Sequence, residues 1–337
     1  MKEALLYEKL DKDRVRCNLC AHRCLIGPGK IGVCKVRENR DGILYTKVYG
    51  RTIAQHVDPI EKKPLYHFYP GSRSYSIATP GCNFHCDFCQ NWDISQITRS
   101  GILESGYDAT PEQIAEDAEH RGCTSIAYTY TEPTIFFEYS YDTARAARQK
   151  GLKNVYVSNG FMTPEMLEMI NPYLDGINVD LKAFSDETYR RLIGARLHPI
   201  LDSLKKIREL GIWLEVTSLI IPGVNDGPEE IRDMANFVAT ELGTGVPWHI
   251  SRFSPAFKMG DTPSTPLRTL QMAKETGRKA GLDYVYVGNV SSDTDMNTNC
   301  PGCGELLIER LYFGVARNRI KNGKCPDCGT PITGIGL

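Results

Sequence analysis

Eleven of the twelve cysteines in the chain fall into three groups whose spacing is typical of metal ligands. In a cytosol that keeps thiols reduced, such groups bind metals instead of forming disulfides. Cys123 stands outside the groups, and we expect it to be a small buried hydrophobic residue. The groups are Cys17, Cys20, Cys24 and Cys34; then Cys82, Cys86 and Cys89; then Cys300, Cys303, Cys325 and Cys328.

The middle group has the spacing C-x3-C-x2-C and follows a predicted strand at residues 75–79. Iron-sulfur clusters bind cysteine thiolates, and a cubane has four irons, so three protein ligands leave one iron open. An open metal position serves a ligand that is not protein, as in catalytic zinc sites. Phe84 and Phe88 would shield the cluster from water. The alternative is a zinc or ferredoxin-type site whose fourth ligand is His85 or Cys123.

The cysteine spacing, the aromatic residue before the last cysteine and the position after the first predicted strand resemble the signature of radical S-adenosylmethionine (SAM) enzymes. The resemblance implies that Cys82, Cys86 and Cys89 hold a 4Fe-4S cluster whose open iron is chelated by the amino and carboxylate groups of SAM. It also implies the reaction: one electron passed to the sulfonium releases methionine and a 5'-deoxyadenosyl radical, which abstracts hydrogen from a substrate.

Polar residues at the ends of the next predicted strands extend the resemblance, because barrel active sites form at these ends. The segment Tyr130-Thr131-Glu132-Pro133 is similar to the Gly-Gly-Glu-Pro of the family, which holds the SAM amino group. Tyr130 and Thr131 replace the two glycines, which puts a close backbone approach in doubt. Glu132 keeps the carboxylate and is the residue that carries over.

Two further segments resemble the activating enzymes of glycyl radical enzymes. Ser158 and Asn159 lie in a Ser-Asn-Gly-Phe segment, and Asp180 and Lys182 lie in an Asp-Leu-Lys segment. The resemblance places both segments beside SAM. Val157 stands where those relatives carry an aspartate for a monovalent cation, so we do not expect the cation site.

His249 and Arg252 on the sixth predicted strand are candidates for the SAM ribose or the substrate. Each candidate also has a purely structural alternative: an ion pair for Asp180 and Lys182, a turn at Asn159, and a core histidine at His249. The predicted SAM-binding residues are Glu132, Ser158, Asn159, Asp180, Lys182 and His249.

Over essentially the whole chain, the sequence resembles the radical SAM member of the AmmeMemoRadiSam system, which is similar to pyruvate formate-lyase activating enzymes. The segments that carry this resemblance are 17–24, 58–68 and 89–96. It implies a reductant such as ferredoxin or flavodoxin. The hydrogen donor that it implies is a glycine Cα of a partner protein or a small molecule.

The two outer groups contain four cysteines each. The N-terminal group has the spacing C-x2-C-x3-C-x9-C, which favours structural zinc, while an accessory 4Fe-4S cluster would use the same thiols. The C-terminal group consists of two C-P-x-C-G knuckles and predicts a zinc ribbon, with rubredoxin-like iron as the alternative.

Short β-branched or aromatic runs alternate with helical segments through the middle of the chain, which predicts parallel strands joined by crossover helices. Thr110 and Thr163, each followed by a proline, mark two helix starts. The sequence therefore predicts an α/β fold with a partial TIM-like (β/α)6 barrel at 72–290. A four-cysteine module at 1–71 precedes it, and a zinc-ribbon-like module at 291–337, which begins with a polar stretch at 291–295, follows it. The predicted strands are 75–79, 124–130, 154–159, 176–180, 213–220, 246–253 and 284–288.

Composition excludes several classes of protein. The 337 residues contain 40 Lys and Arg against 41 Asp and Glu, so no net positive charge attracts nucleic acid or an anionic membrane. No apolar run approaches the roughly 18 residues of a membrane span, and the charged first residues lack a secretion signal. We expect a soluble cytoplasmic protein. The alternatives to a radical SAM enzyme are a zinc-ribbon adaptor or nucleic-acid-binding module with a degenerate barrel, and an electron carrier.

Overall fold

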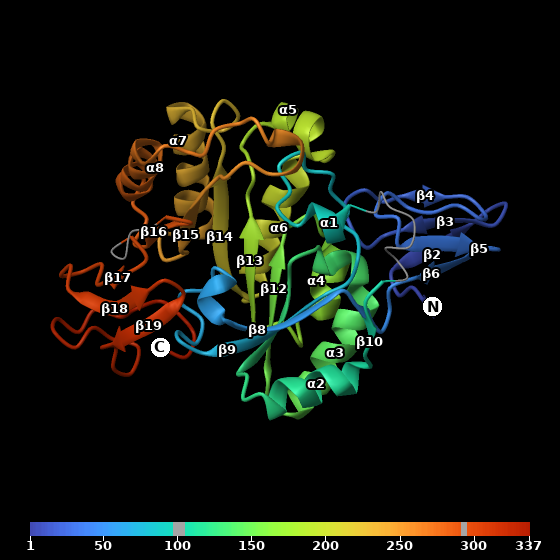
Figure 1. Cartoon of the computed structure of the whole chain (residues 1–337), viewed down its shortest axis with the longest axis horizontal. Coiled ribbons are helices and arrows are strands. Elements are labelled where there is room, and N and C mark those ends of the chain that lie inside the picture. The colour runs from blue at the N-terminus through green and yellow to red at the C-terminus, as the bar shows by residue number, and fades with distance from the viewer. Residues whose placement is uncertain (97–104, 291–294) are drawn as a thin grey trace.

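An eight-stranded sheet forms the centre of the computed structural model, which describes residues 1–96, 105–290 and 295–337 (Figure 1). Its strand order is β16-β15-β14-β13-β12-β11-β9-β8. Strand β9 and strands β11 to β16 run parallel and correspond to the seven predicted strands. Their bounds are β9 Arg73–Ala78, β11 Ser125–Tyr128, β12 Lys153–Ser158, β13 Gly176–Asp180, β14 Trp213–Ile220, β15 Trp248–Arg252 and β16 Val285–Gly288.

The eighth strand, β8 (Ala54–Pro59), pairs antiparallel with β9 and was not expected from the sequence. It is partly exposed and mixes polar residues with one valine, so it lacks the apolar run that marks the buried parallel strands. Strands β8 and β16 form the two edges of the sheet and do not pair with each other. The barrel is therefore partial, as predicted.

Helices cover the outer face of this sheet. Thr110 caps α2 with the predicted capping box, in which its hydroxyl accepts from Gln113 N and its backbone N–H donates to the Gln113 side chain. Thr163 caps α4 through one side-chain hydrogen bond, in which its hydroxyl accepts from Met166 N. The helices are α1 Trp92–Ser95, α2 Pro111–His120, α3 Phe137–Gln149, α4 Pro164–Ile170, α5 Asp186–Thr188, α6 His198–Glu209, α7 Pro228–Phe237 and α8 Leu267–Lys279.

Short 3-10 and π segments supplement the helices. The 3-10 segments span Ile60–Lys62, Pro133–Phe136 and Phe257–Met259, and the π segments span Tyr189–Ile193 and Val238–Leu242. Within the part of the chain that the structure describes, no helix combines the length and apolarity needed to cross a membrane.

The N-terminal residues form two small antiparallel sheets on one flank of the main sheet (Figure 1). The Thr163 hydroxyl donates to Asn18 O over 2.8 Å, which ties this module to the start of α4. The first sheet contains β1 Lys2–Glu3, β5 Arg37–Arg40 and β6 Ile43–Thr46, and the second contains β2 Tyr7–Leu10, β3 Arg14–Cys17 and β4 Leu25–Ile26. A further pair joins β7 Arg51–Thr52 to β10 Tyr107–Asp108.

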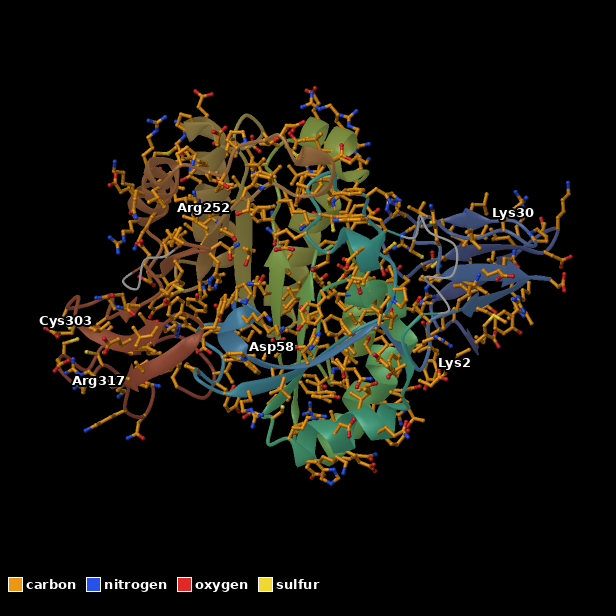
Figure 2. The ribbon with its side chains drawn as sticks, in the orientation of Figure 1. Lys2, Lys30, Asp58, Arg252, Cys303 and Arg317 are labelled. Atoms are coloured by element: carbon orange, nitrogen blue, oxygen red, sulfur yellow. The ribbon has the colours of Figure 1, made fainter. Side chains whose placement is uncertain are left out.

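The C-terminal residues form a three-stranded sheet on the opposite flank, with β17 Thr298–Asn299, β18 Leu306–Leu311 and β19 Gly314–Asn318. Figure 2 shows Lys30 at the outer end of the N-terminal module and Cys303 at the far side of the molecule. The buried Arg310 guanidinium joins the C-terminal sheet to the segment between β8 and β9 by donating to Tyr66 O over 2.8 Å. Most of the polar stretch that was expected to begin this module, 291–294, lies outside the described residues.

Candidate functional site

The three-cysteine loop borders a cavity of about 390 Å³ at the carboxyl ends of the parallel strands. This is the edge at which α/β barrels place their active sites. Backbone hydrogen bonds anchor the loop, with Gly81 N donating to Ile94 O and His85 N donating to Ile193 O, each over 2.9 Å. The cavity is lined by Lys62, Lys63, Cys82, Phe84, Cys86, Phe88, Cys89, Gln90, Asn91, Ser95, Gln96, Thr129, Tyr130, Thr131, Glu132, Val157, Ser158, Asn159, Asp180, Lys182, Thr217, Leu219, Ser251 and Asn289.

The chemistry of the loop fits an iron-sulfur cluster. Burial raises the pKa of Cys86 to about 12 and raises that of Cys82 well above its usual value. Burial thus disfavours the charged thiolate form of these cysteines. A nearby cation reverses this by stabilising the thiolate, and iron provides that cation. Phe84 and Phe88 are both nearly inaccessible and line the cavity, as expected for residues that keep water from a cluster.

Glu132 lies just beyond β11 and is buried at the cavity wall. Its Oε1 accepts from Thr134 N over 3.0 Å, the Thr134 hydroxyl over 2.6 Å and the Ser158 hydroxyl over 2.8 Å. Its Oε2 accepts from Asn159 N over 2.8 Å. Burial raises the pKa of Glu132, and these hydrogen bonds oppose the shift. The Oε2 atom keeps acceptor capacity for a cationic group in the cavity.

Tyr130 adopts the backbone conformation that a glycine would provide. Its φ is 64°, in the left-handed region that non-glycine residues rarely occupy. Its hydroxyl donates a short hydrogen bond to Asp58, and its carbonyl accepts from Asn91 Nδ2 over 2.9 Å. Tyr130 thus stands at the first glycine position of the Gly-Gly-Glu-Pro segment and keeps a glycine-like backbone. Its side-chain and carbonyl contacts hold that conformation.

Asn159 links the cavity wall to the cysteine loop. Its Nδ2 donates to Asn83 Oδ1 over 2.7 Å and lies 3.9 Å from Cys82 Sγ. The next residue, Gly160, has a φ of 72°, and an added Cβ there would lie 2.7 Å from a Val179 methyl group. Glycine is therefore required at this turn, which fixes Asn159 against the loop.

Asp180 and Lys182 form an ion pair at the end of β13, with Lys182 Nζ 2.9 Å from Asp180 Oδ2. Both side chains line the cavity. Burial alone would lower the pKa of Lys182, but Asp180 and the Cys86 thiolate raise it overall. Lys182 therefore supplies a positive charge beside the cysteine loop. Val157 also lines the cavity.

His249 and Arg252 do not line this cavity. His249 is near the start of β15, where its Nε2 lies 2.6 Å from the Oε2 atom of the fully buried Glu215. Arg252 donates from Nε to Thr265 O over 2.9 Å. The structure thus places His249 in a buried contact with Glu215, which agrees with the core-histidine alternative.

Several lining residues were missed from the sequence. Lys63 lines the cavity from the segment after β8, and its Nζ lies 2.6 Å from Oδ2 of Asp58, a β8 residue outside the lining. Burial lowers the pKa of Lys63 to about 8, against the opposing effect of Asp58. Lys63 and Asp58 belong to the segment 58–68, which carries part of the AmmeMemoRadiSam resemblance. Their spacing in the sequence did not indicate a site. Thr217 and Ser251 are single polar residues on strands and gave no signal.

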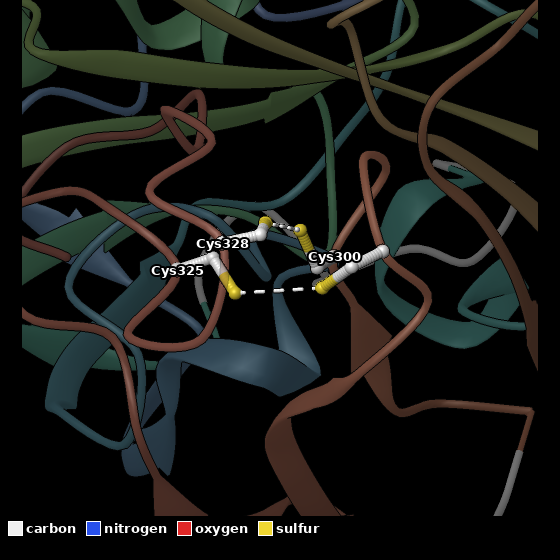
Figure 3. Close-up of side chains that lie close together, drawn as sticks. Cys300, Cys325 and Cys328 are labelled. Carbon is white, nitrogen blue, oxygen red and sulfur yellow. Dashed lines mark hydrogen bonds between the residues drawn. The ribbon is translucent and has the colours of Figure 1, made fainter.

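The C-terminal cysteines converge on one point, as the close-up in Figure 3 shows. Cys300 Sγ lies 3.6 Å from Cys328 Sγ, and Cys303 Sγ lies 3.7 Å from Cys325 Sγ. Two sulfur atoms that each bind one zinc ion at about 2.3 Å and at a tetrahedral angle lie about 3.8 Å apart. The four sulfurs therefore fit a single tetrahedral metal ion.

The N-terminal cysteines Cys17, Cys20, Cys24 and Cys34 line a separate, largely apolar pocket together with Arg37. The leftover cysteine, Cys123, is buried just before β11, as expected. The predicted ligands thus lie at three different places in the fold.

Comparison with known proteins places the chain in a family. Residues 76–238 match the family model described as the Radical SAM superfamily. An uncharacterised protein of Methanocaldococcus jannaschii, MJ0808, is 44% identical over 334 residues, which cover 98% of this chain and 99% of that protein. The chain belongs to the radical SAM superfamily, and the family implies a 4Fe-4S cluster and SAM as its cofactors.

More distant relatives have assigned activities. The chain is 24% identical over 185 residues to the pyruvate formate-lyase 1-activating enzyme of Escherichia coli K12, covering 50% of this chain and 71% of that enzyme. A radical SAM methyltransferase from Sphaerobacter thermophilus superposes with a TM-score of 0.51 at 17% identity, covering 71% of each chain. The methyltransferase structure shows the shared fold.

Proposed function

We propose that this protein cleaves SAM reductively and uses the resulting radical to abstract hydrogen from a substrate, as the radical SAM member of the AmmeMemoRadiSam system. The observation that carries the proposal is the meeting of the three loop cysteines with Glu132 and the Asp180–Lys182 pair in one cavity. When bound, the cluster supplies the electron that splits SAM into methionine and the 5'-deoxyadenosyl radical.

The residues of the cavity have separate roles in this proposal. The hydrogen bond from Asn159 N holds the Glu132 carboxylate in place. Glu132 Oε2 would accept a charge-assisted hydrogen bond from the ammonium group of SAM. Lys182, which pairs with Asp180 at the cavity wall, would offset the negative charge of the cluster thiolates and of the SAM carboxylate. Phe84 and Phe88 keep water away from the radical chemistry.

The experiment is an anaerobic assay of 5'-deoxyadenosine after reconstitution with iron and sulfide, reduction with dithionite and addition of SAM. Wild type and Cys123→Ala are expected to form product, whereas Cys86→Ala forms none. Equal product from Cys86→Ala would refute the proposal. An intact cluster in wild type that neither binds nor cleaves SAM would favour the electron-carrier alternative. Zinc without sulfide would favour the adaptor or nucleic-acid alternative.

We propose a glycine Cα of a partner protein as the hydrogen donor, supported by the similarity to the pyruvate formate-lyase 1-activating enzyme. Extracts of deuterium-grown cells, separated by ultrafiltration into protein and small-molecule fractions, test the donor class. Deuterium in 5'-deoxyadenosine is expected only with the protein fraction. Deuterium from the small-molecule fraction alone would identify a small substrate instead.

We also propose a ferredoxin or flavodoxin as the reductant and zinc as the metal of Cys300, Cys303, Cys325 and Cys328. The zinc proposal is supported by the sulfur spacing of 3.6 and 3.7 Å. Metal analysis of protein purified without reconstitution tests it, with about one zinc per chain expected from this group. Iron in its place, with no zinc, would indicate the rubredoxin-like alternative.

A further inference from the structure

The N-terminal cysteines are spaced differently from the C-terminal ones. Among the described residues, the C-terminal four form the one group of three or more metal-ligating atoms that all lie within 4.8 Å of one another. The sulfurs of Cys17, Cys20, Cys24 and Cys34 are therefore more widely spread, although all four line one pocket. A single zinc ion requires the closer arrangement, because all its sulfurs share one metal.

The cysteine loop of the radical site provides an internal comparison. Its three sulfurs also fail to lie within 4.8 Å of one another, and they border one cavity. A cubane needs such a spread, because each thiolate binds a different iron corner. The N-terminal group thus shares with the iron-sulfur loop the lack of the close sulfur arrangement that the C-terminal group has.

Arg37 provides an independent observation at the same pocket. Its guanidinium is buried and donates from Nη2 to Glu138 Oε2 over 2.5 Å. Its Nε and Nη1 atoms are buried and have no hydrogen-bond partner within the described structure. Unpaired buried donors are costly, so an acceptor in this pocket would account for them. The sulfur atoms of a cluster are acceptors of this kind.

The pocket also lies directly beside the radical site. His22, which lines the pocket, has its Nε2 2.8 Å from the backbone oxygen of Asn83, the neighbour of Cys82. The His22 ring packs edge-on against Phe161 at 4.8 Å, and Phe161 packs on Phe84 at 5.3 Å. A metal group held here therefore sits against the loop that carries the radical chemistry.

We propose that Cys17, Cys20, Cys24 and Cys34 bind a second 4Fe-4S cluster, and that Arg37 donates hydrogen bonds to its sulfur atoms. This site replaces the structural zinc that the cysteine spacing alone favoured. Four protein thiolates close the cluster, so it has no open iron for SAM. The proposal does not depend on SAM cleavage, because the cluster is measured without SAM.

The decisive sample is the Cys82→Ala, Cys86→Ala, Cys89→Ala triple variant, reconstituted anaerobically with iron and sulfide. It is expected to retain about four irons and four sulfides per chain, with an electron paramagnetic resonance (EPR) signal after reduction. Adding Cys20→Ala and Cys24→Ala is expected to remove that iron and sulfide. Adding Cys123→Ala instead is expected to leave both in place.

A triple variant that holds no iron or sulfide, with zinc or no metal in the N-terminal group, would overturn the proposal even if wild type cleaves SAM. A retained cluster in a protein that does not cleave SAM would support it and refute only the proposed function. The triple variant keeps all four N-terminal cysteines, so its metal content decides the matter even if the five-fold variant fails to fold.

The role of Arg37 is tested by Arg37→Lys in the same triple background. Lysine keeps the positive charge opposite Glu138 but lacks the two free guanidinium donors. Hydrogen bonds to sulfur raise the reduction potential of a cluster, so the variant is expected to have a lower potential. An unchanged potential at full iron content would refute the hydrogen bonds from Arg37.

Discussion

The Glu132 carboxylate, just past β11, accepts a hydrogen bond of 2.8 Å from the backbone N–H of Asn159, just past β12. The two residues are 27 apart in sequence and meet because parallel strands present their carboxyl ends at the same edge. The bond aims one carboxylate oxygen into the cavity, next to the cysteine loop that Asn159 also contacts through Asn83.

Replacing Glu132 is expected to weaken SAM binding. A hydrogen bond to a charged group contributes about 1.5–3 kcal/mol, so Glu132→Gln is expected to raise the SAM Kd about 10-fold to 100-fold. Equilibrium dialysis with labelled SAM on reconstituted protein measures the change. Glu112→Gln, on the exposed face of α2, serves as the control. An unchanged Kd at full cluster content would contradict this role.

Lys182 is expected to tune the cluster of the radical site. Lys182→Met removes a partly buried positive charge beside Cys86, and a more negative surrounding lowers the reduction potential of a cluster. A redox titration that follows the EPR signal lost in Cys86→Ala measures the potential. Lys279→Met, on an exposed position of α8, should leave it unchanged. A potential that stays constant in Lys182→Met would show that its charge does not reach the cluster.

Removing the Tyr130 hydroxyl is expected to reduce stability modestly. Tyr130→Phe removes the donor to Asp58, which keeps its bonds from Lys62 and Lys63. Such a hydrogen bond contributes about 1 kcal/mol, so the free energy of unfolding should fall by about that amount in urea titrations. Tyr312→Phe, whose ring is exposed, is expected to have no effect. Equal stability of Tyr130→Phe and wild type would indicate that Asp58 is satisfied without it.

The buried His67 is expected to make stability depend on pH between about 6.5 and 4. Burial lowers its pKa to about 4, while Thr333 O and the Tyr286 hydroxyl bond its two ring nitrogens. Below pH 6.5 the unfolded chain takes up a proton that the folded chain refuses, so stability falls as the pH drops toward 4.

The measurement is the free energy of unfolding at steps of pH for wild type and His67→Gln. The wild-type slope in this window is expected to be steeper, by up to a few kcal/mol over the whole window. His120→Gln, at the exposed end of α2, should keep the wild-type slope. A His67→Gln slope as steep as wild type would assign the pH dependence to other groups.

The C-terminal metal is expected to hold its module together. Cys328→Ser should lose the metal and lower the Tm, because the small sheet has little core of its own. Elemental analysis and thermal unfolding measure both effects, with Cys123→Ala as the control that keeps the metal. Full metal content in Cys328→Ser would remove Cys328 from the ligand set.

The sequence by itself determined the local features. Each metal-binding motif lies within a short segment of the chain. This holds for Cys82, Cys86 and Cys89 and for the two C-terminal knuckles, so residue spacing alone indicates that they bind metal. Parallel strands share one edge, so the polar residues after β11, β12 and β13 could be expected to meet, and Glu132, Asn159 and Asp180 do line one cavity.

Only the tertiary structure decided features that depend on position along a strand or on distant segments. His249 bonds Glu215 on the neighbouring strand and does not line the cavity, although Thr217, its register partner on β14, does. Tyr130 meets Asp58 from 72 residues away. The distances between the N-terminal sulfur atoms likewise depend on how the strands around Cys17 and Cys34 pack. The spacing of cysteines along the sequence indicates which residues are near one another, but it does not determine how far apart their sulfur atoms lie.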